Sequence, residues 1–133
     1  MSNTPSKKIK KPPMQFVNWF EIPVHDLTRS VAFFNQVYGI EMETVENGEY
    51  AMALFPVETG VGGALVKGQG STPSETGVLI YLNASDDMTT MLGRISDAGG
   101  RIIMEKTLIN ADAGYFALFV DTEGNRLALH SNK

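Results

Sequence analysis

Cysteine is absent from this sequence of 133 residues, and its absence excludes several kinds of chemistry. Without a thiol, the chain can form no disulfide, no thiolate zinc site and no cysteine nucleophile. Long hydrophobic runs are missing too, since no apolar stretch approaches the roughly 20 residues that span a bilayer. We therefore expect a cytoplasmic protein that has no membrane-spanning segment and no membrane partner.

Basic residues are scarce outside the first 13 residues. The chain has 11 lysines and arginines against 15 aspartates and glutamates. Four of the lysines lie in MSNTPSKKIKKPP, and the rest of the chain has 7 basic and 15 acidic residues, a formal charge of −8. Such an acidic body repels phosphate backbones, so nucleic acid is not an expected partner. Residues 1–13 lack the apolar core of a secretory signal and are predicted to form a flexible basic tail.

The first half of the remaining chain has the pattern of one helix among four strands. Asp26 stands at the N-cap position of an apolar stripe with helical spacing, and Gly39 supplies the stop. Asn47-Gly48 is typical of a hairpin turn. The predicted elements are a strand over residues 15–23, a helix over 26–37 and strands over 40–46, 49–55 and 60–67.

The second half repeats this order. It predicts a strand over residues 76–83, a helix over 86–98 capped by Asp86 or Asp87, and three further strands. The halves also match in sequence: Asp26 aligns with Asp86 at an offset of 60, and Ala53-Leu54-Phe55 with Ala117-Leu118-Phe119 at an offset of 64. The four additional residues are expected in a loop within residues 105–112. The sequence therefore predicts a duplicated βαβββ module.

Three stretches carry a resemblance to a known family. They are VHDLTRSVAFFNQVYGI, ISDAGGRI and FVDTEGNRLAL, and together with the duplication they resemble the vicinal oxygen chelate superfamily of glyoxalase I, bleomycin resistance proteins and extradiol dioxygenases. The FEIP stretch and the Gly62-Gly63 pair are similar to a glyoxalase-related branch. The resemblance implies an α+β fold of tandem βαβββ modules with mixed, strongly curved sheets. Residues 14–133 would form one domain, with modules at about 15–67 and 76–131.

Metal-dependent members of this superfamily hold an ion with four side chains, two from each module. The resemblance maps those positions onto Trp19 and Ala64 in the first module, and onto Ile80 and Ala128 in the second. A one-residue shift would put Leu79 or Tyr81 in place of Ile80. Divalent ions need oxygen or imidazole donors, which these side chains do not supply. We therefore expect no metal and no other cofactor.

Two polar residues remain as candidates for chemistry. Strand alternation puts Glu21 on the face of Trp19, and His130 on the face of Ala128. Glu21 could be a general base with His130 as its partner, or it could simply pair with Arg126, while His130 could be a partly exposed residue of the last strand. His25 is expected to be solvated or to cap the first helix.

The predicted pocket consists of Trp19, Glu21, Ala64, Ile80, Ala128 and His130. Small and apolar residues at the metal positions would leave an apolar cavity, with Asn18 or Tyr50 as further polar groups. A protein that binds a small planar or aromatic molecule is the first hypothesis, and the alternative is a metal-independent lyase or isomerase with Glu21 as base. A metal-dependent lyase or dioxygenase is disfavoured, and whether the protein is an enzyme stays open. A homodimer is expected, with the cavity formed within one chain or between two chains.

Overall fold

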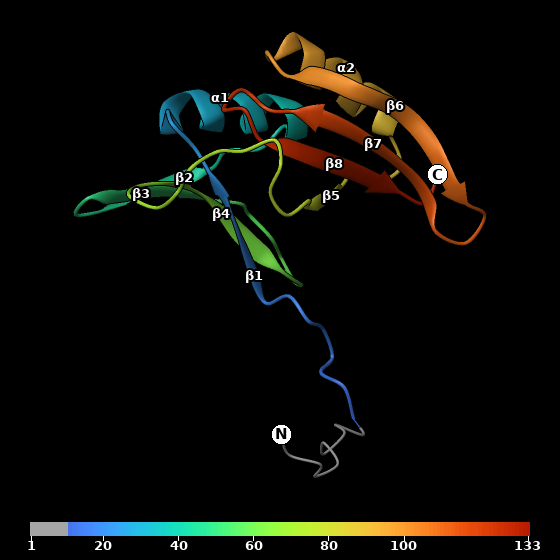
Figure 1. Ribbon diagram of the computed structural model, residues 1–133, viewed down its shortest axis with the longest axis horizontal. Coiled ribbons are helices and arrows are strands. Elements are labelled where there is room, and N and C mark those ends of the chain that lie inside the picture. The colour runs from blue at the N-terminus through green and yellow to red at the C-terminus, as the bar shows by residue number, and fades with distance from the viewer. Residues whose placement is uncertain (1–10) are drawn as a thin grey trace, which may run out of the picture.

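The computed structural model describes residues 11–133, so residues 1–10 of the predicted basic tail lie outside the described residues. The described chain contains two four-stranded sheets, each with one helix (Figure 1). The first module consists of β1 (Trp19–Pro23), α1 (Leu27–Tyr38), β2 (Glu43–Asn47), β3 (Tyr50–Leu54) and β4 (Gly62–Lys67). The second consists of β5 (Tyr81–Asn83), α2 (Met88–Asp97), β6 (Arg101–Asn110), β7 (Gly114–Val120) and β8 (Arg126–Ser131).

The two sheets have the same topology. Their strand orders are β1-β4-β3-β2 and β5-β8-β7-β6. In each sheet the first strand runs parallel to the last strand of its module, and the other pairs are antiparallel. The predicted α+β fold of two βαβββ modules is thereby confirmed. Both sheets are curved, and neither closes into a barrel (Figure 1).

Both helices begin at the predicted kind of cap. The Asp26 carboxylate accepts a hydrogen bond from the backbone N–H of Arg29 at 3.0 Å, which satisfies one free donor of the first turn of α1. Gly39 ends this helix in the left-handed conformation, with φ of 66°. The cap of α2 is Asp87 rather than Asp86, because its carboxylate accepts from the backbone N–H of Thr90.

Three strands begin at least three residues later than predicted, and in each case the strand partner explains the difference. β1 begins at Trp19 rather than Gln15, because Trp19 pairs with Gly62, the first residue of β4. β5 begins at Tyr81 rather than Thr76, because Tyr81 already pairs with Ala128, close to the start of β8. β2 begins at Glu43 rather than residue 40, opposite Leu54 at the end of β3.

The prediction that the four additional residues lie in a loop within residues 105–112 is wrong in one respect, because most of that range is in a strand. That strand is β6, which has 10 residues and pairs with β7 through several register shifts. The additional residues of the second module therefore lengthen and bend a hairpin. Asn110 closes its turn, since its side-chain oxygen accepts from the backbone N–H groups of Asp112 and Ala113.

One hydrophobic core joins the two modules on the faces that the helices cover. Phe33 of α1 packs near Phe119 of β7, with ring centroids 6.3 Å apart. Ile22 and Leu65 from the first sheet, and Leu82 and Leu129 from the second, belong to the same core. The opposite face of each sheet has no helix, and we call it the helix-free face. Within residues 11–133, neither helix is long and apolar enough to cross a membrane.

Candidate functional site

The helix-free face of the first sheet brings together three of the predicted site residues. Glu21 pairs with Ala64 across β1 and β4, and Trp19 lies two residues earlier on the same face. The indole Nε1–H of Trp19 donates to the Glu21 carboxylate at 3.3 Å. Trp19 is 49% exposed, so its ring is a wall of this open face and not a core side chain.

Gly62 explains how the indole lies against this sheet. A Cβ added at Gly62 would be 3.3 Å from the Trp19 ring, which is tighter than an ordinary contact. The first glycine of the Gly62-Gly63 pair therefore lets the ring approach the β4 backbone. Tyr50, a proposed polar group of the pocket, donates its hydroxyl to the carbonyl of Gln69 at 3.3 Å. Asn18 accepts a hydrogen bond from the side chain of Gln15.

The helix-free face of the second sheet holds Ala128 and His130. The Nε2 of His130 lies 2.6 Å from the carbonyl oxygen of Ala113, in the β6–β7 turn. A carbonyl oxygen can only accept, so Nε2 carries the proton and donates it. This bond fixes the imidazole against the end of the hairpin, and Nδ1 is the nitrogen left to act as an acceptor.

Ile80 does not share the face of Ala128. The residue that pairs with Ala128 is Tyr81, whereas Ile80 packs against the hydrophobic core. Of the two alternatives to Ile80, Tyr81 is the residue opposite Ala128, just as Glu21 is opposite Ala64 in the first sheet. In the described chain, no group of three or more histidines, aspartates and glutamates could hold a metal ion. The apolar and small side chains on the helix-free faces therefore do not fit the divalent metal ion that the superfamily implies.

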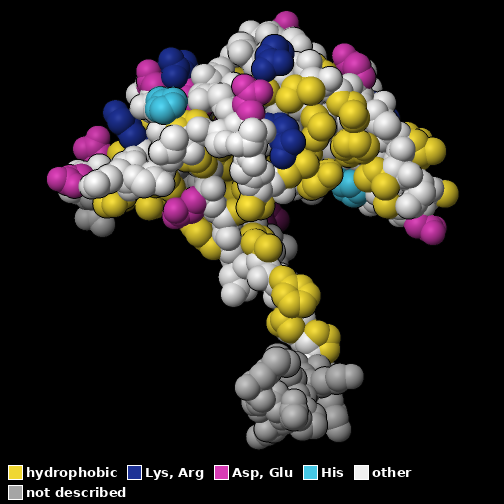
Figure 2. Space-filling model, in the orientation of Figure 1, with side chains coloured by type: hydrophobic (Ala, Val, Ile, Leu, Met, Phe, Trp, Pro, Cys, Tyr) yellow, Lys and Arg dark blue, Asp and Glu magenta, His cyan; other side chains and the backbone are white. Residues whose placement is uncertain are grey.

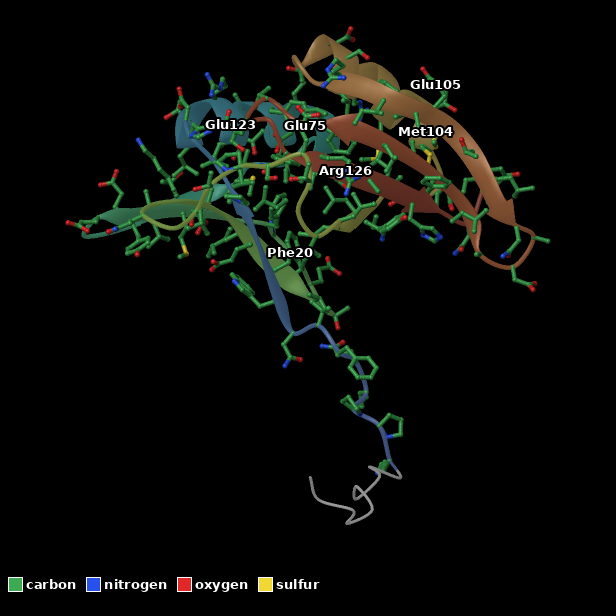
Figure 3. The ribbon with its side chains drawn as sticks, in the orientation of Figure 1. Phe20, Glu75, Met104, Glu105, Glu123 and Arg126 are labelled. Carbon is green, nitrogen blue, oxygen red and sulfur yellow. The ribbon has the colours of Figure 1, made fainter. Side chains whose placement is uncertain are left out.

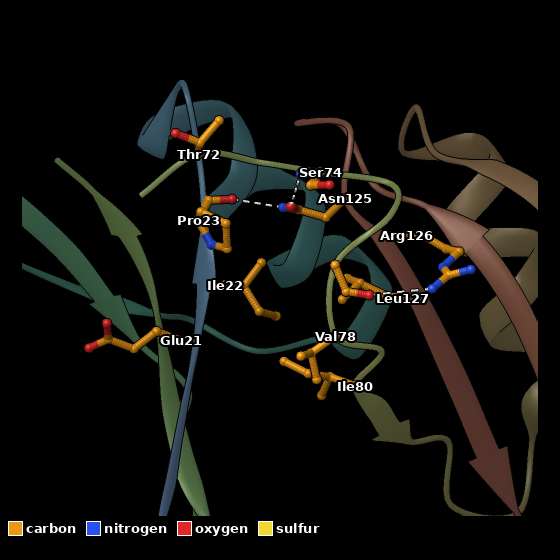
Figure 4. Close-up of a pocket in the computed structure, with 11 residues that line it drawn as sticks. Glu21, Ile22, Pro23, Thr72, Ser74, Val78, Ile80, Asn125, Arg126 and Leu127 are labelled. Carbon is orange, nitrogen blue, oxygen red and sulfur yellow. Dashed lines mark hydrogen bonds between the residues drawn. The ribbon is translucent and has the colours of Figure 1, made fainter. Parts of the chain in front are cut away.

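Glu21 and His130 belong to different sheets, and no interaction joins them in the described residues. Glu21 does not pair with Arg126 either, since the Arg126 guanidinium donates to the carbonyl of Gly77. Glu21 and Arg126 nevertheless border the same cavity, which has a volume of about 210 Å³ and lies at the seam between the modules (Figure 4). Of the predicted pocket residues, this cavity contains Glu21 and Ile80 and leaves out Trp19, Ala64, Ala128 and His130.

Asn125 holds the seam together and was missed as a site residue. Its side-chain amide donates to the carbonyl of Pro23 at 2.7 Å, and its side-chain oxygen accepts from the backbone N–H of Ser74 (Figure 4). Three segments far apart in the sequence therefore meet at one amide group. The only sequence signal was the Gly124-Asn125 pair, which is also typical of an ordinary turn.

Hydrophobic side chains remain exposed on the second sheet. Figure 2 shows them gathered over β6, β7 and β8, and Figure 3 places Met104 on β6 and Arg126 on β8. Met104 pairs with Leu118 on the helix-free face and is 40% exposed, and Tyr81 on the same face is 52% exposed. Apolar side chains clustered on an open sheet face are typical of a surface that binds something.

The fold is shared with solved structures that have low sequence identity to this chain. A glyoxylase/bleomycin resistance protein/dioxygenase domain from Frankia sp. EAN1pec matches with a TM-score of 0.71 and 15% identity, over 91% of this chain and 100% of that one. A glyoxalase/bleomycin resistance protein/dioxygenase family enzyme from Burkholderia phytofirmans PsJN matches with a TM-score of 0.64 and 16% identity, over 87% of this chain and 98% of that one. Glyoxalase I from Zea mays matches with a TM-score of 0.63 and 18% identity, over 84% of this chain and 42% of that one.

These likenesses define a protein of paired βαβββ modules. The family model of the Glyoxalase/Bleomycin resistance protein/Dioxygenase superfamily matches residues 16–129, and the chain belongs to that superfamily. None of the curated proteins compared with the chain matches it in sequence.

Proposed function

We propose that this protein binds a small, planar and largely apolar molecule on its helix-free faces without the help of a metal ion. The observation that carries the proposal is the set of side chains on the helix-free faces, with Trp19 and Ala64 on the first sheet and Tyr81 and Ala128 on the second. Ala64 and Ala128 are fully buried in the two sheets, and the half-exposed aromatic rings of Trp19 and Tyr81 offer faces on which a planar molecule can stack.

The same arrangement favours a homodimer. Neither Trp19 nor Tyr81 lines the cavity at the seam between the modules, so a ligand stacked on either ring stays open to water in one chain. A second copy that places its own sheet over the helix-free face would enclose the ligand and cover exposed side chains such as Met104 and Tyr81. The cavity would then form between two chains.

The alternative is a metal-independent lyase or isomerase in which Glu21 takes a proton. That hypothesis needs a carboxylate in apolar surroundings with a partner for proton transfer. In one chain Glu21 is exposed, its neighbour is the indole N–H of Trp19, and His130 belongs to the other sheet. These features favour binding over catalysis, because an exposed Glu21 without a nearby proton-transfer partner is a poor general base.

A titration of tryptophan emission tests the proposal, because Trp19 is the only tryptophan of the chain. We expect neutral planar aromatics to change its emission saturably, and Trp19→Ala to remove the binding while the protein stays folded. Light scattering and a native mass spectrum report the oligomeric state and any retained molecule. The proposal would be contradicted if none of a broad panel of compounds gave a saturable change in emission, or if the protein were a monomer at all concentrations.

Glu21→Gln separates binding from catalysis in the same titration. The substitution keeps the shape and hydrogen bonding of the side chain and removes its basicity. A binding protein retains its affinity and turns over none of the panel in either form. Turnover by the natural protein that disappears in Glu21→Gln, with binding retained, would establish the enzyme instead.

A further inference from the structure

A second and larger cavity lies next to the cavity at the seam and extends toward the helix-covered faces of the sheets. It has a volume of about 550 Å³ and opens between the two modules, at the end of α1. Phe20 and Leu82 line it from the helix-covered faces of the two sheets, and Ile40 and Val61 line it from connecting segments. We call this cavity the intermodule cleft. Its walls come from both modules, so it exists only because the modules pack together.

The intermodule cleft has an apolar lining. None of the described residues that line it carries a charge. Tyr38 supplies a hydroxyl group, but that hydroxyl already donates to the carbonyl of Asn83 at 2.8 Å. This hydrogen bond connects the end of α1 to β5, and burial raises the pKa of Tyr38 far above its ordinary value. A ligand therefore meets hydrocarbon on most sides and finds little that would compensate a charge.

One wall of the intermodule cleft is a rigid aromatic cluster. The rings of Phe20 and Phe55 have centroids 5.5 Å apart, and Phe55 meets Phe34 of α1 edge to face at 5.3 Å. Phe34 is fully buried, so the cluster is anchored in the core. Rings held in this way present a preformed surface, which lowers the cost of ordering side chains when a ligand binds.

The mouth of the intermodule cleft is a rim of exposed hydrophobic side chains. Val17 and Val57 are each 54% exposed, Tyr81 is 52% exposed, and Val78 is 92% exposed. All four line the cleft. Hydrophobic residues that gather around one opening, instead of lying singly over the surface, mark a place where an apolar molecule enters or rests.

We infer that the intermodule cleft is a binding site for a small, uncharged, apolar molecule, distinct from the surface around Trp19, although Tyr81 at its rim also belongs to the helix-free face of the second sheet. Its volume falls within the range of about 300–1,000 Å³ that is usual for small-molecule sites. A helix of a partner protein, about 10 Å across, needs a longer groove than a cavity of this size provides. The occupant touches both modules and therefore stabilises their packing.

The neutral fluorophore N-phenyl-1-naphthylamine tests this inference on the full chain. We expect saturable binding with a rise in probe emission and in the unfolding temperature. Val61→Trp fills the intermodule cleft with apolar atoms and should weaken probe binding about tenfold or more. Val45→Trp is the matched control on β2, on the helix-free face, and should leave the affinity within about twofold.

Other outcomes overturn the inference. Weaker binding in Val45→Trp, with Val61→Trp unchanged, would place the probe on the helix-free face. A change of oligomeric state in Val61→Trp alone would show that a second copy occupies the cleft. Trp19→Ala separates this inference from the proposed function, because it should remove binding on the helix-free face and leave the probe in the cleft.

A direct measurement decides the question even if Val61→Trp fails to fold. Crystals of the natural protein soaked with 1-bromonaphthalene should show anomalous bromine density between the two modules, beside Phe20 and Phe55. Density on the helix-free faces alone, or no ordered bromine, would refute the inference.

Discussion

The guanidinium Nε of Arg29 lies 2.6 Å from the carboxylate Oε2 of Glu123, although the two residues are 94 positions apart in the chain. Arg29 belongs to the first turns of α1, and Glu123 belongs to the turn between β7 and β8. The Glu123 side chain is fully buried, and it also accepts from the backbone N–H groups of His25 and Asp26 at 2.8 and 2.7 Å. One carboxylate thus connects the start of the first helix to the second module.

Removing the charge of Glu123 should destabilise the protein. Glu123→Gln keeps the size of the side chain and the oxygen that accepts from the backbone N–H groups of residues 25 and 26, but it places an amide NH2 group opposite the Nε–H donor of Arg29. We expect a loss of about 2 kcal/mol in the free energy of unfolding, measured by urea denaturation. Glu75→Gln is the control, because Glu75 meets Arg101 at 3.5 Å on the exposed surface and should contribute little. Equal effects of the two substitutions would contradict this account.

The contribution of Glu123 should depend on pH in a defined direction. Burial alone would raise the pKa of Glu123, but the hydrogen bonds from Arg29, Asp26 and His25 outweigh it and lower the pKa below its ordinary value of 4.5. A carboxyl group with a lowered pKa stabilises the fold above its unfolded pKa, and this stability is lost as the pH falls through the folded pKa.

The stability difference between the natural protein and Glu123→Gln should therefore be constant near neutral pH and shrink in acid, below about pH 4.5. Asp121 in the same turn acts in the opposite direction, because burial raises its pKa against the hydrogen bonds that lower it. Comparison of the two proteins at each pH isolates Glu123. A difference that grows as the pH falls would contradict the assignment.

Trp19 should be much less important for stability than a core aromatic. Its side chain is half exposed, so Trp19→Ala removes little buried surface and should cost about 1 kcal/mol. Phe34→Ala is the comparison, since Phe34 is fully buried and truncation of a core aromatic costs about 3–5 kcal/mol. Both values come from chemical denaturation. A cost for Trp19→Ala that matches Phe34→Ala would make Trp19 a core residue and remove it from the proposed site.

Gly114 should not tolerate a side chain. It has φ of 83°, which L residues rarely adopt, and an added Cβ would collide with the backbone of Ser131 on β8. Gly114→Ala should therefore lower the unfolding free energy by about 2 kcal/mol and disturb the hairpin of β6 and β7. Gly77→Ala meets open space and should change stability by less than about 0.5 kcal/mol, which differential scanning calorimetry can resolve.

The purified protein should carry no stoichiometric zinc, nickel, iron or manganese. The resemblance implies ligand positions at Trp19, Ala64, Ile80 and Ala128, and neither these side chains nor Tyr81 beside Ala128 offers a carboxylate or imidazole. Elemental analysis of protein purified without chelators measures the metal content. About one ion per chain, lost when Glu21→Gln and His130→Ala are combined, would show that displaced ligands have replaced the usual set.

The sequence alone determined the order of the elements, the duplication and most helix ends. These features depend on neighbours in the chain: the Asp26 cap acts on Arg29, three residues away, and Gly39 ends α1 through its own backbone angle. Ala64 and Ala128 could also be matched to each other, because they differ by the same 64 positions as Ala53 and Ala117. Local patterns carry this information, since the interactions that they describe are themselves local.

Tertiary structure alone decided which side chains face which cavity. Tyr81 rather than Ile80 lies beside Ala128 because pairing with β8 sets the register, and a shift by one residue turns a side chain to the other face. The same holds for the carboxylate of Glu123, whose partner is 94 residues away, and for the intermodule cleft, whose walls belong to both modules. Contacts between residues so far apart leave no periodic pattern in either segment, so they arise only when the two modules pack together.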